Sequence, residues 1–463
     1  PLEYGVIRGK SSVRKLYLDR LLKAGELEQE VALEREEDYQ EHLAEAWLFS
    51  KRQRSLPLEG PSDGAWQGFL TSAPKDIFLP VESSVPQELL HDLTQRLTSI
   101  PSGFKLHPKL ERLMRDRLAM LDGGLDWAMG EHLAFATLLW DGTHIRMAGQ
   151  DCKRGTFGHR HAVWVDQENA NTHTPLCDLK VGQGRFDIVN SPLSEFAALG
   201  FEFGYSLSYP KALVIWEAQF GDFANGAQII IDQFFCTSEQ KWRRYSGLVL
   251  FLPHGQEGQG PEHSSARLER FLANCSQDNI QVTVPTTPAQ LFHLLRRQVL
   301  RPWRRPLVVC TPKKYLRHPL ATSSISEFTK GCFQEVLPDP APPGPTRKCI
   351  LCSGKVYFEL IQEREARGVK GVRIHRLEQL HPFHRDAVKA LLDASPSGEV
   401  LWVQEEPINQ GGYGFVRDRI QELLPEGQPL QVVARPAFAS PAVGSHGAFM
   451  KEHQDLMDRA LGE

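Results

Sequence analysis

Four short apolar runs, each followed by a helical pattern, constrain the fold of this chain most strongly. Near-continuous apolar strands are typical of a sheet that is covered on both faces, and intervening helices allow neighbouring strands to run parallel. The runs are Ala212 to Trp216, Gly247 to Leu252, Ile280 to Val284 and Pro306 to Cys310. We therefore predict an α/β domain in which helices flank a parallel sheet, with one helix beginning at Pro288 after Thr287.

A proline-rich stretch marks the clearest domain boundary. Residues 337–346 read LPDPAPPGPT, and five prolines in ten residues predict a stiff, extended linker. Strand and helix patterns alternate again beyond it, which predicts a second, smaller α/β domain with a parallel sheet over residues 347–463. Its expected strands are Cys349 to Cys352, Val372 to Leu377, Val400 to Gln404 and Gln431 to Ala434.

The first 64 residues differ from the rest of the chain. Ser11 to Arg54 are rich in charge and carry leucines at helical spacing, so we expect one or two surface helices there. The breaker stretch LPLEGPSDG follows at residues 56–64. We expect residues 1–64 to be a helical tail and linker ahead of the first α/β domain at residues 65–336. Because the chain begins with Pro1 and not with Met, we expect a fragment, a processed chain or an incomplete one.

Charge and hydropathy argue against two classes of partner. The chain has 53 basic and 57 acidic residues and a net charge of −4, so there is no bulk electrostatic case for binding nucleic acid. We interpret the basic clusters Arg296-Arg297 and Arg301 to Arg305 as a solvated face or as a surface that pairs with carboxylates. No run of eighteen apolar residues occurs, which excludes a membrane-spanning helix. We recognise no signal peptide at the start, and a missing N-terminal half would contain any targeting sequence.

The cysteines and paired histidines do not predict a metal site. Eight cysteines in 463 residues do not make a disulfide framework, and most of them lie in apolar stretches. Cys349 and Cys352 form a lone CxxC, whereas zinc usually needs four ligands, and on a strand the two side chains would face opposite sides. Adjacent side chains also diverge in the triplet His159 to His161. We therefore predict structural cysteines and no metal ligands in this chain.

Three segments place reactive side chains just after predicted strands or at a helix start, where catalytic groups usually lie. They are NSPLSEFA with Glu195, IWEAQFGDFANGAQ with Phe220 and Phe223, and GQGPEHSSARLER with His263. An aminopyrimidine ring needs an aromatic wall, and a partly desolvated carboxylate facing its nitrogen can share a proton with it. An imidazole can donate a hydrogen bond or a proton to a 2-oxo acid or its adduct.

These candidate site residues can also have purely structural roles, and their spacing in the sequence does not decide between the two possibilities. Glu195 can be a carboxylate at a helix N-terminus, with Ser191 or Ser194 as the cap. His263 can be a turn residue that caps the following helix. His318, in YLRHPLA, is interpreted as structural.

The amino-acid sequences of several longer segments resemble those of a known enzyme family. NSPLSEFAALGFEFGYSL, VIWEAQFGDFANGAQIIIDQF, LVLFLPHGQEGQGPEHSSARLERFL, RRPLVVCTPKKYLRHPLA and WVQEEPINQGGYGFVRDR closely resemble the decarboxylating component of the 2-oxoglutarate dehydrogenase complex. GQDCKRGTFGHRHAV and the opening PLEYGVIRGKSSVRKLYLDRLL fit the same family. The resemblance covers nearly the whole chain and implies a transketolase-like fold, with the second domain serving dimer assembly.

The resemblance also implies roles for individual residues. Glu195 matches the cofactor-activating glutamate, and His263 matches the histidine that faces the substrate. Phe220 and Phe223 match aromatic residues around the aminopyrimidine of thiamine diphosphate, and Leu193 and Gln219 match lesser contacts. A minor departure is Gln256, which stands where the family pattern has an aromatic residue.

One larger departure limits what this chain can do alone. The family holds the diphosphate and Mg²⁺ with a Gly-Asp-Gly motif followed by paired asparagines, and Asp122-Gly123-Gly124 does not fit that pattern. We expect these ligands, and two further substrate histidines, in a missing half. The implied activity is decarboxylation of 2-oxoglutarate with succinyl transfer to the lipoyl arm of a succinyltransferase, by a homodimer in the bacterial cytoplasm or mitochondrial matrix. The alternatives are another 2-oxo acid, such as 2-oxoadipate, a carboligase, or a non-catalytic partner subunit.

Overall fold

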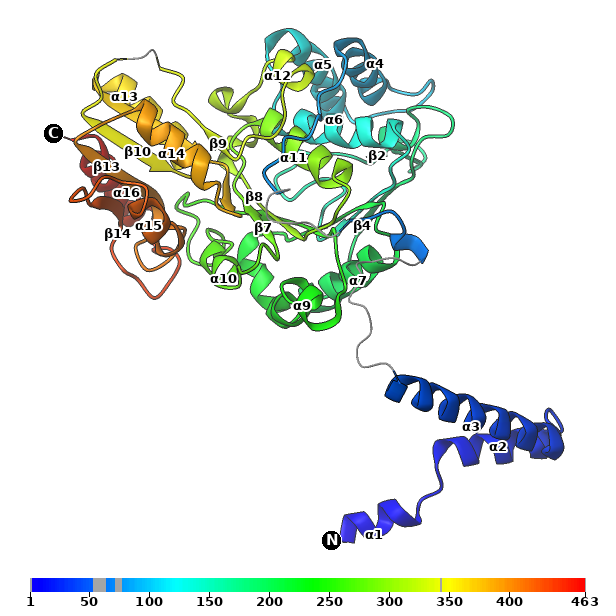
Figure 1. Ribbon diagram of the computed structural model, residues 1–463. Coiled ribbons are helices and arrows are strands. Elements are labelled where there is room, and N and C mark those ends of the chain that lie inside the picture. Colours follow the sequence, from blue (N-terminus) through cyan, green and yellow to red (C-terminus); the bar gives the residue numbers. More distant parts are fainter. Residues whose placement is uncertain (1, 53–63, 71–76, 342–343, 463) are drawn as a thin grey trace. The chain divides into compact units, whose positions relative to one another are not determined.

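The computed structural model describes residues 2–52, 64–70, 77–341 and 344–462, in two compact units at Pro1–Glu59 and Gly60–Glu463 (Figure 1). The first unit consists of α1 (Leu2–Gly9), α2 (Val13–Ala24) and α3 (Gln29–Arg52). The Ser12 side chain accepts the Lys15 amide at the start of α2, and Gly25 ends it with a φ of 67°. No described residue of α2 or α3 is buried. The predicted surface helices are therefore α2 and α3, and the predicted breaker, except Gly64, lies outside the described residues.

A seven-stranded sheet forms the centre of the second unit, in the order β12-β7-β8-β6-β5-β1-β4. All neighbours pair in parallel except β12, which is antiparallel to β7. The strands are β1 (Ile145–Gly149), β4 (Phe186–Asn190), β5 (Leu213–Glu217), β6 (Val249–Pro253), β7 (Gln281–Thr283), β8 (Leu307–Thr311) and β12 (Gln379–His381). The predicted parallel α/β fold is confirmed.

Helices cover both faces of this sheet, as Figure 1 shows for α6 and α11 on one side and α7 and α10 on the other. Leu213 and Ile215 of β5 face the first set, and Val214 and Trp216 face the second. One layer contains α4 (Gln87–Thr98), α5 (Pro108–Gly123), α6 (Trp127–Trp140), α11 (Pro288–Leu300) and α12 (Ser326–Thr329). The other contains α7 (Glu195–Ser208), α8 (Gln228–Ile230), α9 (Ser238–Trp242) and α10 (Leu268–Ala273).

The second, five-stranded sheet has the order β14-β13-β10-β11-β9, in which only β9 pairs antiparallel. Cys349 packs in the core shared with the first sheet and Cys352 in the core on the opposite face, as the sequence predicted. The strands are β9 (Val336–Leu337), β10 (Lys348–Cys352), β11 (Val372–Leu377), β13 (Glu399–Pro407) and β14 (Leu430–Arg435). Its helices are α13 (Val356–Ala366), α14 (Arg385–Ala394), α15 (Tyr413–Gln421) and α16 (His446–Leu461).

The structure differs from the prediction in two places that concern the domain connection. Strand β12 follows β11 in the chain but joins the first sheet, so the second domain contributes an edge strand to the first sheet. A three-residue strand gives too short a pattern to recognise in the sequence. No α-helix follows β8 directly: residues Lys314–Arg317 and Pro319–Ala321 form 3₁₀ turns, since Pro312 and Pro319 interrupt helix formation, and the short α12 begins only at Ser326.

The proline-rich linker is anchored to the second sheet. Asp339 is buried and accepts the backbone amides of Ile374 at 2.8 Å and Ala341 at 3.0 Å, and it also pairs with the guanidinium of Arg364. Residues 342–343 of the predicted linker lie outside the described residues. The described part of the linker is therefore held by a buried carboxylate as well as by the restricted backbone of its prolines.

A buried ion cluster fixes the long loop that follows β1. Arg160 is 1% exposed and donates to Glu131 of α6 at 2.5 and 2.9 Å and to Glu217 of β5 at 2.7 and 2.6 Å. Although burial opposes its charge, the two carboxylates hold the pKa of Arg160 well above its usual range. Burial raises the pKa of Glu217, although the charge of Arg160 acts to lower it. The cluster therefore ties the loop to the sheet and to α6.

Removing this guanidinium should destabilise the protein strongly. Arg160→Met leaves two buried carboxylates unpaired, so we expect a loss of about 3–5 kcal/mol in the free energy of unfolding. The exposed Arg154, 3.5 Å from Asp151 in the same loop, is the control, and Arg154→Met should cost less than about 1 kcal/mol. Urea unfolding measures both values.

The same variant should show a defined pH dependence. A carboxyl whose folded pKa is raised binds more protons folded than unfolded, so stability increases as the pH falls from the folded pKa towards 4.5. Without Arg160 the folded pKa of the carboxyl rises further, so this pH range becomes wider. The loss of stability in Arg160→Met should therefore become smaller as the pH falls from about 8 to about 5. A deficit that stays constant over this range would show that the carboxylates are not the cause.

The crossing of α6 and α11 leaves no room for a side chain at Gly130. A Cβ atom there would lie 2.8 Å from the carbonyl oxygen of Pro288 and 2.9 Å from its Cβ. Gly130→Ala should therefore lower stability by about 1–3 kcal/mol. Gly204→Ala, in α7 with nothing within 4 Å, should instead be neutral or stabilise by up to about 1 kcal/mol in the same measurement.

Candidate functional site

The carboxyl ends of adjacent parallel strands bring the predicted site residues to one edge of the first sheet. The loop after β4 leads to Glu195, the loop after β1 begins with Gln150, and Phe220 follows β5. His263 lies in the loop after β6, and Lys313 follows β8. From β1 the chain goes to β4 on one side and then to β5 on the other, which is the topological switch point where open α/β sheets bind ligands.

The predicted aromatic pair and the predicted histidine are in contact. The ring centroids of Phe220 and His263 are 4.5 Å apart and nearly perpendicular, at 89°. Phe223 lies 5.9 Å from Phe220 and 5.8 Å from His263. Phe157, from the loop after β1, packs edge-on against Phe220 at 5.4 Å. All four side chains are partly accessible, so they form an aromatic wall with an open side.

Glu195 lies at the same edge and begins α7. Ser194 is the cap, because its hydroxyl accepts the Ala197 amide at 3.4 Å, whereas Ser191 accepts the Leu193 amide instead. The Glu195 carboxylate is partly exposed and accepts a hydrogen bond from Gln150 at 3.3 Å. Its position beside Gly226, where a Cβ atom would lie 3.2 Å from Oε2, brings it next to the segment of Phe223.

The two lesser contact residues border this group. Gln219 donates to the carboxylate of Asp151 at 3.1 Å, which joins the loops after β5 and β1 across the switch point. Leu193 is 47% exposed and precedes α7. Within this chain, therefore, Leu193 has little to pack against.

Sequence reasoning missed three residues of the site. Phe157, Gln150 and Asp151 contact Phe220, Glu195 and Gln219 respectively. All three belong to the GQDCKRGTFGHRHAV segment, which the sequence indicated only as a match to the family. The neighbouring His159 is 5% exposed, and burial lowers its pKa well below 6.5, which keeps its ring neutral.

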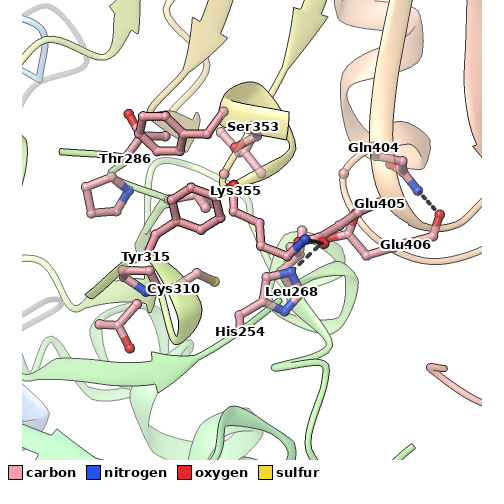
Figure 2. Close-up of a pocket in the computed structure, with 18 of the residues that line it drawn as sticks. His254, Leu268, Thr286, Cys310, Tyr315, Ser353, Lys355, Gln404, Glu405 and Glu406 are labelled. Carbon is pink, nitrogen blue, oxygen red and sulfur yellow. Dashed lines mark hydrogen bonds and ion pairs between the residues drawn. The ribbon is translucent and has the colours of Figure 1, made fainter. Parts of the chain in front are cut away.

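A second polar region lies where the carboxyl ends of the two sheets face each other (Figure 2). Lys355 reaches across it to Glu405 at 2.5 Å and also contacts Glu359 at 2.7 Å. His254 contacts Glu406 at 2.7 Å. The cavity between these side chains measures ≈30 Å³, which is room for about one water molecule.

This region offers the only group of three metal-ligating side chains found among the described residues, namely His254, Glu405 and Glu406. The Ala266 amide donates to Nδ1 of His254 at 3.1 Å, so the ring proton is on Nε2 and is donated to Glu406. A metal-bound Nε2 would have to be unprotonated. Glu405 is already paired with the ammonium of Lys355. These three side chains therefore do not fit a metal ion.

Two interpretations of charged and sulfur-bearing residues can now be decided. The described cysteines are free thiols, and burial raises the pKa of Cys349 to about 12, which agrees with a structural role. The solvated-face interpretation of the basic clusters is wrong, because Arg296, Arg297 and Arg305 are buried. The carboxylate-pairing alternative holds for part of the clusters: Arg297 lies 2.7 Å from Glu335, and Arg305 lies 2.9 Å from Glu239. Arg304 instead donates to the backbone carbonyl oxygens of Pro210 and Arg301. A helix long and apolar enough to span a membrane is absent from the described part of the chain.

Comparisons with known proteins agree with this geometry. Residues 123–319 match the family Transketolase, pyrimidine binding domain, and residues 322–461 match the family 2-oxoglutarate dehydrogenase C-terminal. The whole chain is 45% identical to the 2-oxoglutarate dehydrogenase E1 components of Haemophilus influenzae and Cupriavidus necator and 42% identical to that of Brucella anthropi. It covers 49%, 49% and 48% of these proteins. The chain spans about half the length of the curated relatives it matches, and over that span it is similar to 2-oxoglutarate dehydrogenase E1 components.

Proposed function

We propose that this chain supplies the aminopyrimidine half of the thiamine diphosphate site of a 2-oxoglutarate dehydrogenase. The observation that carries the proposal is the contact of Phe220, Phe223 and His263 at one sheet edge, with Glu195 beside the same segment. Aromatic rings with an open side and an accessible carboxylate suit a flat heterocycle with a titratable nitrogen. The names of the relatives support the same assignment.

Each residue has a separate task in this proposal. Phe220 and Phe223 hold the aminopyrimidine ring, and Leu193 and Gln219 border it. Glu195 exchanges a proton with a ring nitrogen, while Gln150 fixes the direction of its carboxylate. His263 donates a hydrogen bond or a proton to the 2-oxo acid. The bound cofactor supplies an electron sink for the carbanion left when carbon dioxide departs.

The diphosphate and Mg²⁺ would be held by another polypeptide segment. Mg²⁺ prefers oxygen ligands in octahedral geometry, whereas the one group of His, Cys, Asp or Glu ligands found among the described residues contains His254 and the already paired Glu405 and Glu406. We propose that this second half also completes the packing of α1, α2 and α3. Those helices expose Val13, Tyr39, Trp47 and Phe49 at 57–83%, and exposed apolar surface of this extent marks an interaction site.

We further propose a homodimer whose sites lie between subunits. Large apolar side chains beside the site are exposed on α7 and its neighbourhood: Phe196 at 44%, Phe201 at 55% and Ile229 at 63%. An apolar groove of ≈610 Å³ adjoins them, lined by Phe203, Ile230 and Trp242 among others. Burial of this surface by a second subunit would remove it from water and narrow the open side of the aromatic wall.

The proposed substrate is 2-oxoglutarate, and the proposed acceptor is the lipoyl arm of a succinyltransferase partner. The relatives named as 2-oxoglutarate dehydrogenase components support this choice over 2-oxoadipate, a carboligase activity or a non-catalytic subunit. The three relatives are bacterial, which favours the bacterial cytoplasm over a mitochondrial matrix.

A decarboxylation assay tests the proposal. The native polypeptide with thiamine diphosphate and Mg²⁺ should release carbon dioxide from 2-oxoglutarate faster than from 2-oxoadipate. Glu195→Gln should lower kcat by about 10²–10⁴-fold, because the amide cannot take up the proton. The exposed Glu168 provides the control, and Glu168→Gln should retain full turnover. Full turnover by Glu195→Gln would contradict the assignment, and no turnover by the wild type would favour a non-catalytic subunit.

A further inference from the structure

The peptide group between His263 and Ser264 is held at both of its polar atoms by oppositely charged side chains. Its carbonyl oxygen, that of His263, accepts from Nζ of Lys313 at 2.5 Å. Its N–H, that of Ser264, donates to Oδ2 of Asp222 at 3.3 Å, and the next amide, that of Ser265, donates to the same oxygen at 3.0 Å. A positive and a negative group therefore fix the orientation of a single peptide plane.

Both charged groups are buried and committed to this loop. Asp222 is 3% exposed, and its Oδ1 has no hydrogen-bond partner among the described residues. Lys313 is 5% exposed, and its ammonium also donates to Gln259 at 2.7 Å and lies 3.8 Å from Glu257. Hydrogen bonds to charged groups are about twice as strong as neutral ones. Water cannot easily replace either partner at this depth.

The loop between His254 and Arg267 needs such a restraint, because it contains no helix or strand. Gly258 and Gly260 adopt φ angles of 72° and 87°. Because glycine has no Cβ atom, these two residues give the backbone before His263 more conformational freedom. The orientation of the His263–Ser264 peptide determines the ψ angle of His263. It thereby affects the direction in which the imidazole projects towards Phe220, 4.5 Å away.

Asp222 also connects the two parts of the candidate site. It lies between Phe220 and Phe223 in the sequence, so the segment that carries the aromatic wall also carries the carboxylate that holds the histidine loop. A shift of one segment is transmitted to the other through two hydrogen bonds. Misplacement of a reacting group by about 1 Å can cost about 10²-fold in rate.

We propose that Asp222 and Lys313 are positioning residues that orient His263 by clamping the His263–Ser264 peptide. This inference rests on the proposed function, because it assumes that His263 faces the substrate. Neither residue needs to touch the substrate or the cofactor. Their effect on turnover is therefore exerted through the imidazole of His263.

A double-mutant cycle in the native polypeptide tests the proposal. Asp222→Ala and Lys313→Met should each lower kcat/KM for 2-oxoglutarate by about tenfold or more. In the His263→Ala background the same changes should lower it by less than about twofold, because the group that they position is absent. Asp222→Asn, which keeps an acceptor oxygen, should recover part of the loss. Asp232→Ala, which removes a carboxylate that accepts from Gln228 and does not contact this loop, is the control and should leave kcat/KM unchanged.

Amide hydrogen exchange gives a readout that does not depend on turnover. Asp222→Ala should speed exchange at Ser264 and Ser265, while the Ala266 amide, which donates to His254 at 3.1 Å, keeps its protection. Equal losses of kcat/KM with and without His263 would overturn the clamp, as would unchanged exchange at Ser264. If His263→Ala itself keeps full turnover while Glu195→Gln does not, the clamp has no functional role although the proposed function survives.

Discussion

The parallel pairing of β4, β1, β5, β6 and β8 is the constraint on which the rest of this structure depends. Parallel neighbours end at the same edge of a sheet, so loops that are far apart in the sequence meet there. The carboxylate of Glu195, the rings of Phe220 and Phe223 and the imidazole of His263 come from three such loops. In a sheet of alternating strand directions, the loop after β6 would lie at the opposite edge from the loop after β5, and His263 would not contact Phe220.

Buried charges hold the ends of these loops in place. Arg160 bridges Glu131 and Glu217, and Asp222 and Lys313 hold the histidine loop from the segments that follow β5 and β8. The second domain contributes from the other side, since Glu405 accepts the Gln256 amide at 3.0 Å. Ion pairs in a low-dielectric interior resist rearrangement, because breaking one leaves an uncompensated charge. A rigid loop of this kind suits a group that has to meet a substrate in one orientation.

Much of the fold could be predicted from the sequence, and the reasons for the failures are physical. The runs at Ala212 to Trp216 and Pro306 to Cys310 correspond to β5 and β8, because strands buried on both faces are continuously apolar. Strand β12 was missed because it spans only Gln379–His381 and pairs with a different sheet from its neighbours in the chain. The contact of Phe157 with Phe220 was equally hidden, since its loop has no periodic pattern.

The candidate site shows the same division. The residue types of Glu195, Phe220, Phe223 and His263 could be selected from their segments, and the structure brings the last three into contact. The burial of Arg296 and Arg297 was not foreseen, because a charge-rich pattern gives no information on which carboxylates lie opposite it. Asp222 was overlooked for a similar reason: its partners are backbone N–H groups, which every residue except proline has.

The most direct test of the account is a crystal structure of the native polypeptide with thiamine diphosphate and Mg²⁺ bound. We predict that the aminopyrimidine ring lies against Phe220 and Phe223, with a ring nitrogen within hydrogen-bond distance of Glu195 and with the diphosphate on residues outside this chain. A cofactor whose ring binds away from Glu195 would contradict the central claim, even if the fold were unchanged.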